Sequence, residues 1–142
     1  MNIYPDTSVI ASLQLRDSFY ADALRVVQTS KGVLWTPWQK VEFYNSMRAR
    51  VWRKALTLAE LRIIENNMRA MLLAGDLVWR HIPAYSLWQE AEELSRKHTP
   101  LLGVRTLDLL HVAAARVLRA THFVTFDTRQ LALARAAGLR VN

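Results

Sequence analysis

Four acidic residues lie in apolar surroundings in widely separated parts of the chain. Each has hydrophobic neighbours, which place its carboxylate at the edge of a core; the four are Asp6, Glu42, Asp108 and Asp127. A carboxylate in such a setting is costly unless a positive group pairs with it, and four near one another repel strongly. A divalent cation is the usual remedy, because hard cations bind carboxylate oxygens. The chain has only 12 acidic residues, so these four indicate a candidate metal site.

Each acidic residue also has a simpler explanation when it is taken alone. Asp6 and Asp127 follow strand-like segments and are favoured residue types for a helix N-cap. Asp108 lies where a negative charge complements a helix dipole, and Glu42 fits the exposed face of a helix. These alternatives stay open for each residue by itself. They lose force together, because the expected fold brings all four positions to one cleft.

Further polar residues lie close to the acidic ones in the sequence. His111 follows Asp108 by three residues and therefore shares its helix face, either as a hydrogen-bonded core histidine or as a metal ligand. A contact to a carboxylate is compatible with both. Arg105, three residues before Asp108, either binds phosphate or neutralises the acidic group. Three hydroxyl residues either cap helices or orient carboxylates: Thr7, Ser8 and Thr125.

The chain is strongly basic, with a net charge of +7 and 15 arginines among its 19 basic residues. Guanidinium groups favour phosphate-rich partners, so contact with nucleic acid competes with the alternative of a solvated surface. The densest basic group contains Arg50 and Arg53. Arg53 projects on the side of Glu42, about 16 Å along the same expected helix, which suits a contact to a nucleic-acid backbone. The five tryptophans pack in the core or in a dimer, or stack on bases.

Strand-like and helical segments alternate along the chain. The expected strands are residues 1–4, 32–36, 77–82, 122–126 and 139–141. The expected helices are residues 7–15, 18–30, 38–54, 57–74, 84–98, 106–119 and 128–137, with a loop at 99–104 that contains Pro100. This alternation predicts an α/β fold with a mainly parallel sheet, whose ligands bind beyond the carboxyl ends of the strands. Asp6 and Asp127 follow strands, while Asp108 and Glu42 lie near helix starts, so all four face one end of the sheet.

Length and composition limit the remaining possibilities. The 142 residues suit one domain, 1–142, that buries a sizeable core. The absence of cysteine excludes disulfides and thiolate chemistry and suits the cytoplasm. The N-terminal segment does not have the pattern of a signal peptide, and no apolar run approaches the length of a membrane span. We therefore expect a cytoplasmic protein without a membrane partner.

Taken together, these segments resemble the PIN domain family, and within it the VapC-type toxins of prokaryotic toxin–antitoxin pairs. The resemblance runs from Asp6 to Val141 and rests on four motifs in order: Asp6-Thr7-Ser8 after the first strand, Glu42 on a helix, Arg105-Thr106-Leu107-Asp108-Leu109-Leu110-His111, and Phe123-Val124-Thr125-Phe126-Asp127. One departure is Pro5, which stands where an apolar strand residue is usual and removes a backbone donor next to Asp6.

The resemblance implies a three-layer sandwich with a parallel sheet flanked by helices, and a Mg²⁺- or Mn²⁺-dependent endoribonuclease. It assigns the catalytic and metal-binding quartet to Asp6, Glu42, Asp108 and Asp127, and it matches the supporting hydroxyls to Thr7, Ser8 and Thr125. A metal-activated water would hydrolyse an RNA phosphodiester, leaving a 5′-phosphate and a 3′-hydroxyl. The family also implies a homodimer and a small VapB-type antitoxin.

Two other functional classes remain open from the sequence. The first is a non-catalytic module of the same fold that binds nucleic acid or a protein partner. The second is a phosphatase with an aspartate nucleophile, similar to haloacid dehalogenases. Such enzymes have a second Asp two residues after the first, and Ser8 occupies that position here, which counts against this class.

Overall fold

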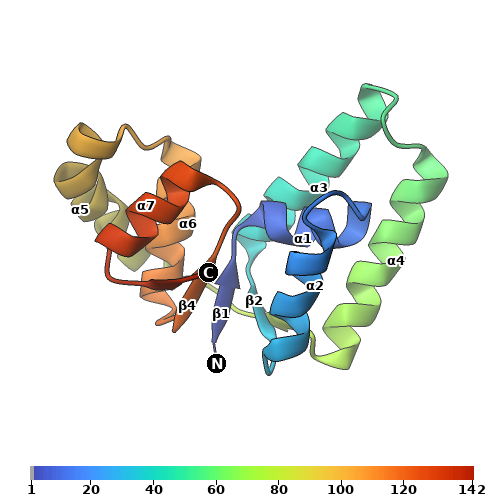
Figure 1. Ribbon diagram of the computed structural model, residues 1–142, viewed down its shortest axis with the longest axis horizontal. Coiled ribbons are helices and arrows are strands. Elements are labelled where there is room, and N and C mark those ends of the chain that lie inside the picture. Colours follow the sequence, from blue (N-terminus) through green and yellow to red (C-terminus); the bar gives the residue numbers. More distant parts are fainter. Residues whose placement is uncertain (1) are drawn as a thin grey trace.

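Five short parallel strands form the central sheet of the protein. The computed structural model describes residues 2–142, so Met1 of the first expected strand lies outside the described residues. The strands are β1 (Ile3–Pro5), β2 (Val33–Trp35), β3 (Leu77–Trp79), β4 (His122–Val124) and β5 (Arg140–Val141). Their order in the sheet is β3-β2-β1-β4-β5, and every neighbouring pair is parallel. The first strand of the chain therefore lies at the centre of the sheet (Figure 1).

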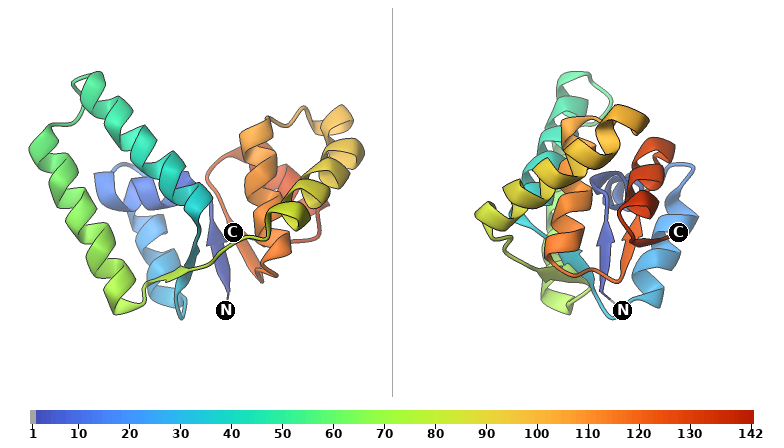
Figure 2. Two further views of the ribbon diagram at one scale, coloured as in Figure 1. Left: turned by 180° about the vertical axis from the view of Figure 1, so that it is seen from behind. Right: turned by 90° about the vertical axis from the view of Figure 1, so that its left-hand side faces the viewer.

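Helices cover both faces of this sheet. They are α1 (Thr7–Leu15), α2 (Tyr20–Thr29), α3 (Pro37–Trp52), α4 (Leu58–Ala74), α5 (Ala84–Leu102), α6 (Thr106–Val117) and α7 (Thr128–Ala136). The first four lie on one side of the strands and the last three on the other (Figures 1 and 2). This arrangement confirms the expected three-layer α/β sandwich. Among residues 2–142, no helix combines the length and hydrophobicity that a membrane span requires.

Each face of the sheet has its own hydrophobic core, because successive side chains of a strand point to opposite faces. Tyr4 of β1 is buried on the side of α5–α7, where it stacks on Phe123 of β4 at a centroid distance of 5.8 Å. Ile3, its neighbour in sequence, is buried on the side of α1–α4. The run from Leu109 to Ala115 in α6 is buried throughout, which fixes this helix and therefore the position of Asp108 at its start.

The expected loop at residues 99–104 is wrong. Helix α5 continues through Pro100 to Leu102 and ends at Gly103, whose φ of 62° is the left-handed conformation that glycine favours at a helix end. A proline in the last turn removes only one backbone hydrogen bond, and packing of Leu102 against the core on this face favours continuing the helix. Other boundaries differ by one to three residues; β3, for example, ends at Trp79 instead of residue 82.

Candidate metal centre

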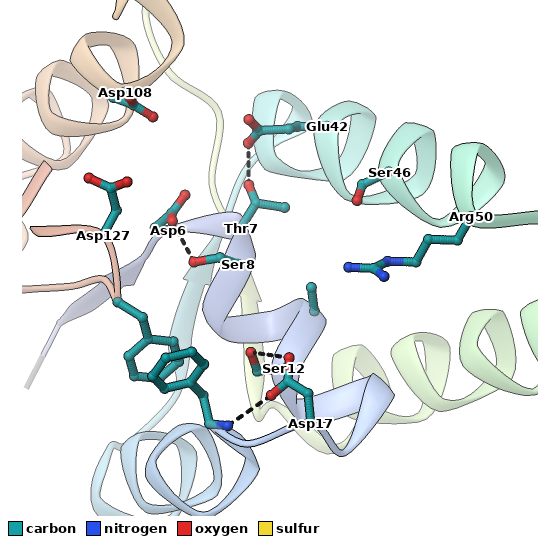
Figure 3. Close-up of a pocket in the computed structure, with 13 residues that line it drawn as sticks. Asp6, Thr7, Ser8, Ser12, Asp17, Glu42, Ser46, Arg50, Asp108 and Asp127 are labelled. Carbon is teal, nitrogen blue, oxygen red and sulfur yellow. Dashed lines mark hydrogen bonds between the residues drawn. The ribbon is translucent and has the colours of Figure 1, made fainter. Parts of the chain in front are cut away.

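The carboxyl ends of β1 and β4 open into a cleft of about 490 Å³. All four acidic residues line this cleft and come from four different elements (Figure 3). Asp6 follows β1, Glu42 lies in the second turn of α3, Asp108 in the first turn of α6, and Asp127 at the N-cap of α7. The structure therefore brings together the four residues that the sequence singled out.

A buried glutamine fixes the start of α3 relative to the end of β1. Gln39 and Thr36 form a capping box, in which the Gln39 carbonyl accepts from the Thr36 backbone N–H at 2.8 Å. The same side chain donates from Nε2 to the carbonyl of Pro5 at 2.8 Å. Because Pro5 precedes Asp6 and Gln39 lies one turn before Glu42, this hydrogen bond couples the positions of two of the carboxylates.

Pro5 leaves the sheet intact despite its missing N–H. It pairs in register with Val124 of β4, and the next residue, Asp6, donates its backbone N–H to the Val124 carbonyl at 2.7 Å. Strand β1 pairs with β2 at Ile3 and Val33, so Pro5 lies beyond this pairing. Its carbonyl is then available to Gln39.

Hydroxyl groups, and not the helix backbone, hold the side chain of Asp6. Although Asp6 occupies the N-cap position of α1, its carboxylate makes no capping hydrogen bond. Its Oδ2 instead accepts from the hydroxyl of Ser8 at 2.6 Å and from that of Thr125 at 3.4 Å. Thr125 also accepts from the backbone N–H of Asp127 at 3.0 Å. These hydroxyls therefore orient the carboxylate of Asp6, which does not cap α1.

Glu42 is held by two residues on neighbouring elements. Thr7 at the start of α1 donates its hydroxyl to Oε2 of Glu42, and Nε2 of His111 lies 2.5 Å from the same oxygen. Burial alone would raise the pKa of the Glu42 carboxyl, but the hydrogen bonds and charge of His111 and the hydrogen bond from Thr7 outweigh it. The pKa of Glu42 therefore lies below its ordinary value, and the group is ionised at neutral pH.

Asp108 shows the opposite shift. Burial raises the pKa of its carboxyl, Arg105 lowers it, and the negative charges of Asp127 and Asp6 raise it further, with a net increase. The guanidinium of Arg105 lies 3.4 Å from Oδ2 of Asp108, but this arginine is largely exposed and the solvent screens the pair. The acidic group is thus only partly neutralised by the protein itself.

Asp127 both caps α7 and faces the cleft. Its Oδ1 accepts from the backbone N–H groups of Arg129 and Gln130, each at 2.9 Å, so it caps α7. Its Oδ2 makes no hydrogen bond within residues 2–142, and Figure 3 shows the carboxylate directed into the cleft near Asp108. The cap explanation and a role in the cleft are therefore compatible for this residue.

The donor set fits a divalent cation. One ligand atom each from Asp6, Glu42 and His111 lies within 4.8 Å of the others. The proton on His111 argues for carboxylates as the ligands. Its Nε2 faces the Glu42 carboxylate, which accepts and does not donate, so this nitrogen carries the hydrogen. Carboxylate oxygens such as those of Asp6 and Glu42 suit a hard divalent cation, and His111 supports Glu42 through this hydrogen bond.

The three arginines that the sequence predicted to contact RNA differ in their position relative to the cleft. Arg50 lines the cleft, and Figure 3 shows its guanidinium extending from α3 into it. Arg105 lies at the cleft edge through its pair with Asp108. Arg53 follows the end of α3 at Trp52 and is not among the residues that line the cleft. No tryptophan lines the cleft within the described range, and Trp35 is fully enclosed in the core.

Sequence reasoning missed several residues that shape the cleft. The far side from Asp108 is lined by Ser12, Asp17, Phe19, Ser46 and Arg50, and of these the sequence indicated only Arg50. Tyr4 and Gln39 support the site from the core. The sequence could have predicted the role of Gln39, because Thr36-Pro37-Trp38-Gln39 has the spacing of a capping box. No such pattern indicated Tyr4, since its partner His111 is 107 positions away.

Comparison of the chain with known proteins shows its family. The chain belongs to the PIN domain family, whose model matches residues 3–138. Its fold is similar to that of Mycobacterium tuberculosis VapC20, a Sarcin-Ricin loop cleaving toxin, with a TM-score of 0.69, 20% identity, and 97% of this chain and 96% of that chain covered. No curated protein sequence matches the chain.

Two further solved structures share the fold. VapBC2 from Rickettsia felis, bound to a DNA fragment from its promoter, has a TM-score of 0.70 at 14% identity, covering 100% of this chain and 98% of that one. VapBC-1 from nontypeable Haemophilus influenzae has a TM-score of 0.64 at 17% identity, covering 100% and 97%. The match to the family model confirms the resemblance to the PIN domain family seen in the sequence, and these solved structures confirm its fold.

Proposed function

We propose that this protein is a Mg²⁺- or Mn²⁺-dependent endoribonuclease and the toxin of a type II toxin–antitoxin pair. The observation that carries the proposal is the convergence of four carboxylates, from four separate elements, in one cleft at the carboxyl ends of parallel strands. The four carboxylates repel one another, and a bound divalent cation would offset this repulsion. Membership of the PIN domain family supports the same reading.

The residues of the cleft divide the work of hydrolysis. Asp6, Glu42 and Asp108 would hold the metal, directly or through water. Asp127 would offer Oδ2, the carboxylate oxygen that does not cap α7, to the same space. A bound ion would supply an activated water for in-line attack and would offset charge on the phosphate. Neighbouring side chains hold the carboxylates in place, so the carboxylates need little rearrangement when the metal binds; these side chains are Thr7, Ser8, Thr125 and His111. The proposed products carry a 5′-phosphate and a 3′-hydroxyl.

Cleavage of RNA by carboxylate variants tests this proposal. Asp6→Asn and Asp108→Asn keep the size of each side chain and remove a negative ligand, and we expect each to lower the rate at least a hundredfold in Mg²⁺. Asp22→Asn, at an exposed pair with Arg25, is the matched control and should cleave as the unaltered protein does. Wild-type cleavage by either cleft variant, or undiminished cleavage in EDTA, would exclude the mechanism. RNA binding without any cleavage would favour a non-catalytic module instead.

The proposed biological setting is the cytoplasm, with a VapB-type antitoxin and a second copy of the chain as partners. Two of the similar structures contain both members of such a pair by their names, which supports the antitoxin. Large exposed side chains, among them Trp52, Tyr85 and Trp88, offer apolar contacts for partners. Light scattering would measure the oligomeric state, and a growth assay with and without the adjacent reading frame would test the toxin.

A further inference from the structure

The cleft extends along α3 beyond the acidic residues. Its far part, which we name the outer subsite, is lined by Ser12, Asp17, Phe19, Ser46, Arg50 and Phe126. Glu42, Ser46 and Arg50 succeed one another at intervals of four residues, so one stripe of the helix connects the metal end with the outer subsite (Figure 3). None of the six residues is required to hold a metal ion.

Arg50 is the one basic residue that lines the cleft within residues 2–142. Its guanidinium makes no ion pair in the described part of the chain, and its Nε is buried without a hydrogen-bond partner there. Arg48, two residues earlier, is instead paired with Glu65 at 3.8 Å on the outside of the helix. A buried donor without an acceptor is costly, and a guanidinium fork matches the oxygens of a phosphate.

An aromatic pair forms the opposite wall of the outer subsite. The rings of Phe19 and Phe126 stack with centroids 4.6 Å apart and planes 12° apart. Phe19 remains 45% exposed, and Phe126 directly precedes Asp127. Single-stranded nucleic-acid sites combine exposed aromatic faces, on which bases stack, with basic groups that contact the backbone.

The loop that carries Phe19 is held in place before any ligand arrives. The carboxylate of Asp17 accepts from the backbone N–H of Phe19 at 2.9 Å and from the hydroxyl of Ser12 at 3.0 Å (Figure 3). Because Ser12 is buried in α1, this contact ties the loop to the same helix that begins at Thr7. A fixed aromatic side chain loses little entropy on binding, which favours its use as a stacking platform.

We propose that the outer subsite binds one nucleotide next to the scissile phosphate, with Arg50 on a phosphate and Phe19 stacked on the base. The position next to a scissile phosphate rests on the proposed function; the binding of a single-stranded nucleotide does not. Each oxygen of Asp17 accepts one hydrogen bond that holds the loop, and stacking on an aromatic face tolerates any base. The subsite therefore distinguishes a base from no base more strongly than one base from another.

Binding of a short single-stranded RNA of mixed sequence tests this proposal. The measurement is fluorescence anisotropy with the full chain in an Asp108→Asn background, where cleavage does not interfere. We expect Arg50→Ala to weaken binding about tenfold and to lower the salt dependence by about one phosphate contact. Phe19→Ala should weaken binding about tenfold, while Phe19→Tyr, which keeps an aromatic face, should not. Arg48→Ala is the matched control on the same helix.

An abasic nucleotide locates the stacked base. Placed in turn at each position of the RNA, it should weaken binding at one position, and this loss should disappear in Phe19→Ala, since the two changes remove the same contact. Equal binding by Arg50→Ala and Arg48→Ala, or additive losses for Phe19→Ala and the abasic RNA, would overturn the subsite even if the protein cleaves RNA. If the losses appear but no cleavage is ever found, the subsite stands and the proposed nuclease fails.

Discussion

The buried hydroxyl of Tyr4 lies 3.1 Å from Nδ1 of His111, on the ring edge opposite to Glu42. In the neutral form of the His111 ring, Nε2 donates to Glu42 and Nδ1 accepts from the hydroxyl of Tyr4. Burial raises the pKa of Tyr4 well above its ordinary value, so this hydroxyl keeps its proton. Tyr4, His111 and Glu42 thus form one directed chain of hydrogen bonds from the core to the cleft.

This chain predicts that His111 acts by positioning Glu42. His111→Ala removes the donor to the carboxylate, and we expect the affinity for Mn²⁺ to fall about 10- to 100-fold, as for other residues that orient metal ligands. His111→Gln retains an amide donor and should recover part of the affinity. Calorimetric titration with Mn²⁺ measures both.

Tyr4→Phe provides a graded comparison for the same chain. It keeps the ring that stacks on Phe123 and removes only the hydroxyl, so we expect a smaller loss of Mn²⁺ affinity than for His111→Ala. If His111→Ala binds Mn²⁺ as tightly as the unaltered protein, His111 is a core residue only.

We expect Asp108 to make the metal-free protein less stable at neutral pH. Its pKa is raised in the folded state, so the folded protein binds the extra proton and stability is lost as the pH rises above about 3.9, the ordinary value. Asp108→Asn should therefore raise the free energy of unfolding in EDTA at pH 7, and the gain should vanish at low pH. Urea unfolding at several pH values measures this, with Asp22→Asn expected to stay within about 0.5 kcal/mol.

Glu42 should behave in the opposite way. Its pKa is lowered despite burial, so the ionised group stabilises the fold above the ordinary value of about 4.3, and this contribution is lost as the pH falls through the folded value. Glu42→Gln is expected to lower the free energy of unfolding in EDTA at pH 7. A change of the same sign for Glu42→Gln and Asp108→Asn would contradict the charge distribution of the cleft.

A divalent cation should stabilise the folded protein through this cleft. An ion that binds only the folded state adds about 2.7 kcal/mol at a hundredfold excess over its Kd. We therefore expect the Tm to rise with Mg²⁺ or Mn²⁺ and to return with EDTA. Asp6→Asn should show a much smaller rise than Asp22→Asn, and an equal rise in both would place the ion elsewhere.

The sequence predicted the fold and the acidic quartet because both depend on local patterns. Alternating strands and helices define the parallel sheet, and residues that follow such strands must meet at one edge. What it missed depends on distance in the chain. Pro100 indicates a break locally, but the packing of Leu102 carries α5 past it.

The arginines show the same limit. Helical spacing placed Arg53 on the side of Glu42, whereas Arg50 is the arginine that lines the cleft. The path of α3 across α1 and the end of the helix at Trp52 decide this, and both are tertiary features. The contact of Phe19 with Phe126, across more than 100 residues, is likewise set by packing between distant segments.

The last prediction concerns Gln39, which couples the fold to the cleft. Gln39→Met keeps the length of the side chain but leaves the N–H of Thr36 and the carbonyl of Pro5 without this partner. We expect a loss of about 2–4 kcal/mol in the free energy of unfolding, because each buried unsatisfied group costs about 1–3 kcal/mol. Gln89→Met, at an exposed glutamine on α5, is the control and should change stability by less than about 0.5 kcal/mol.

Gln39→Glu separates the capping role of Gln39 from its link to Pro5. The new carboxylate still accepts from Thr36, but it cannot donate to the Pro5 carbonyl and repels it instead. Since that carbonyl directly precedes Asp6, we expect the Mn²⁺ affinity of Gln39→Glu to fall even where its α3 cap is intact. Unchanged affinity in a folded Gln39→Glu protein would show that the hydrogen bond stabilises the sheet without setting the distance between Asp6 and Glu42.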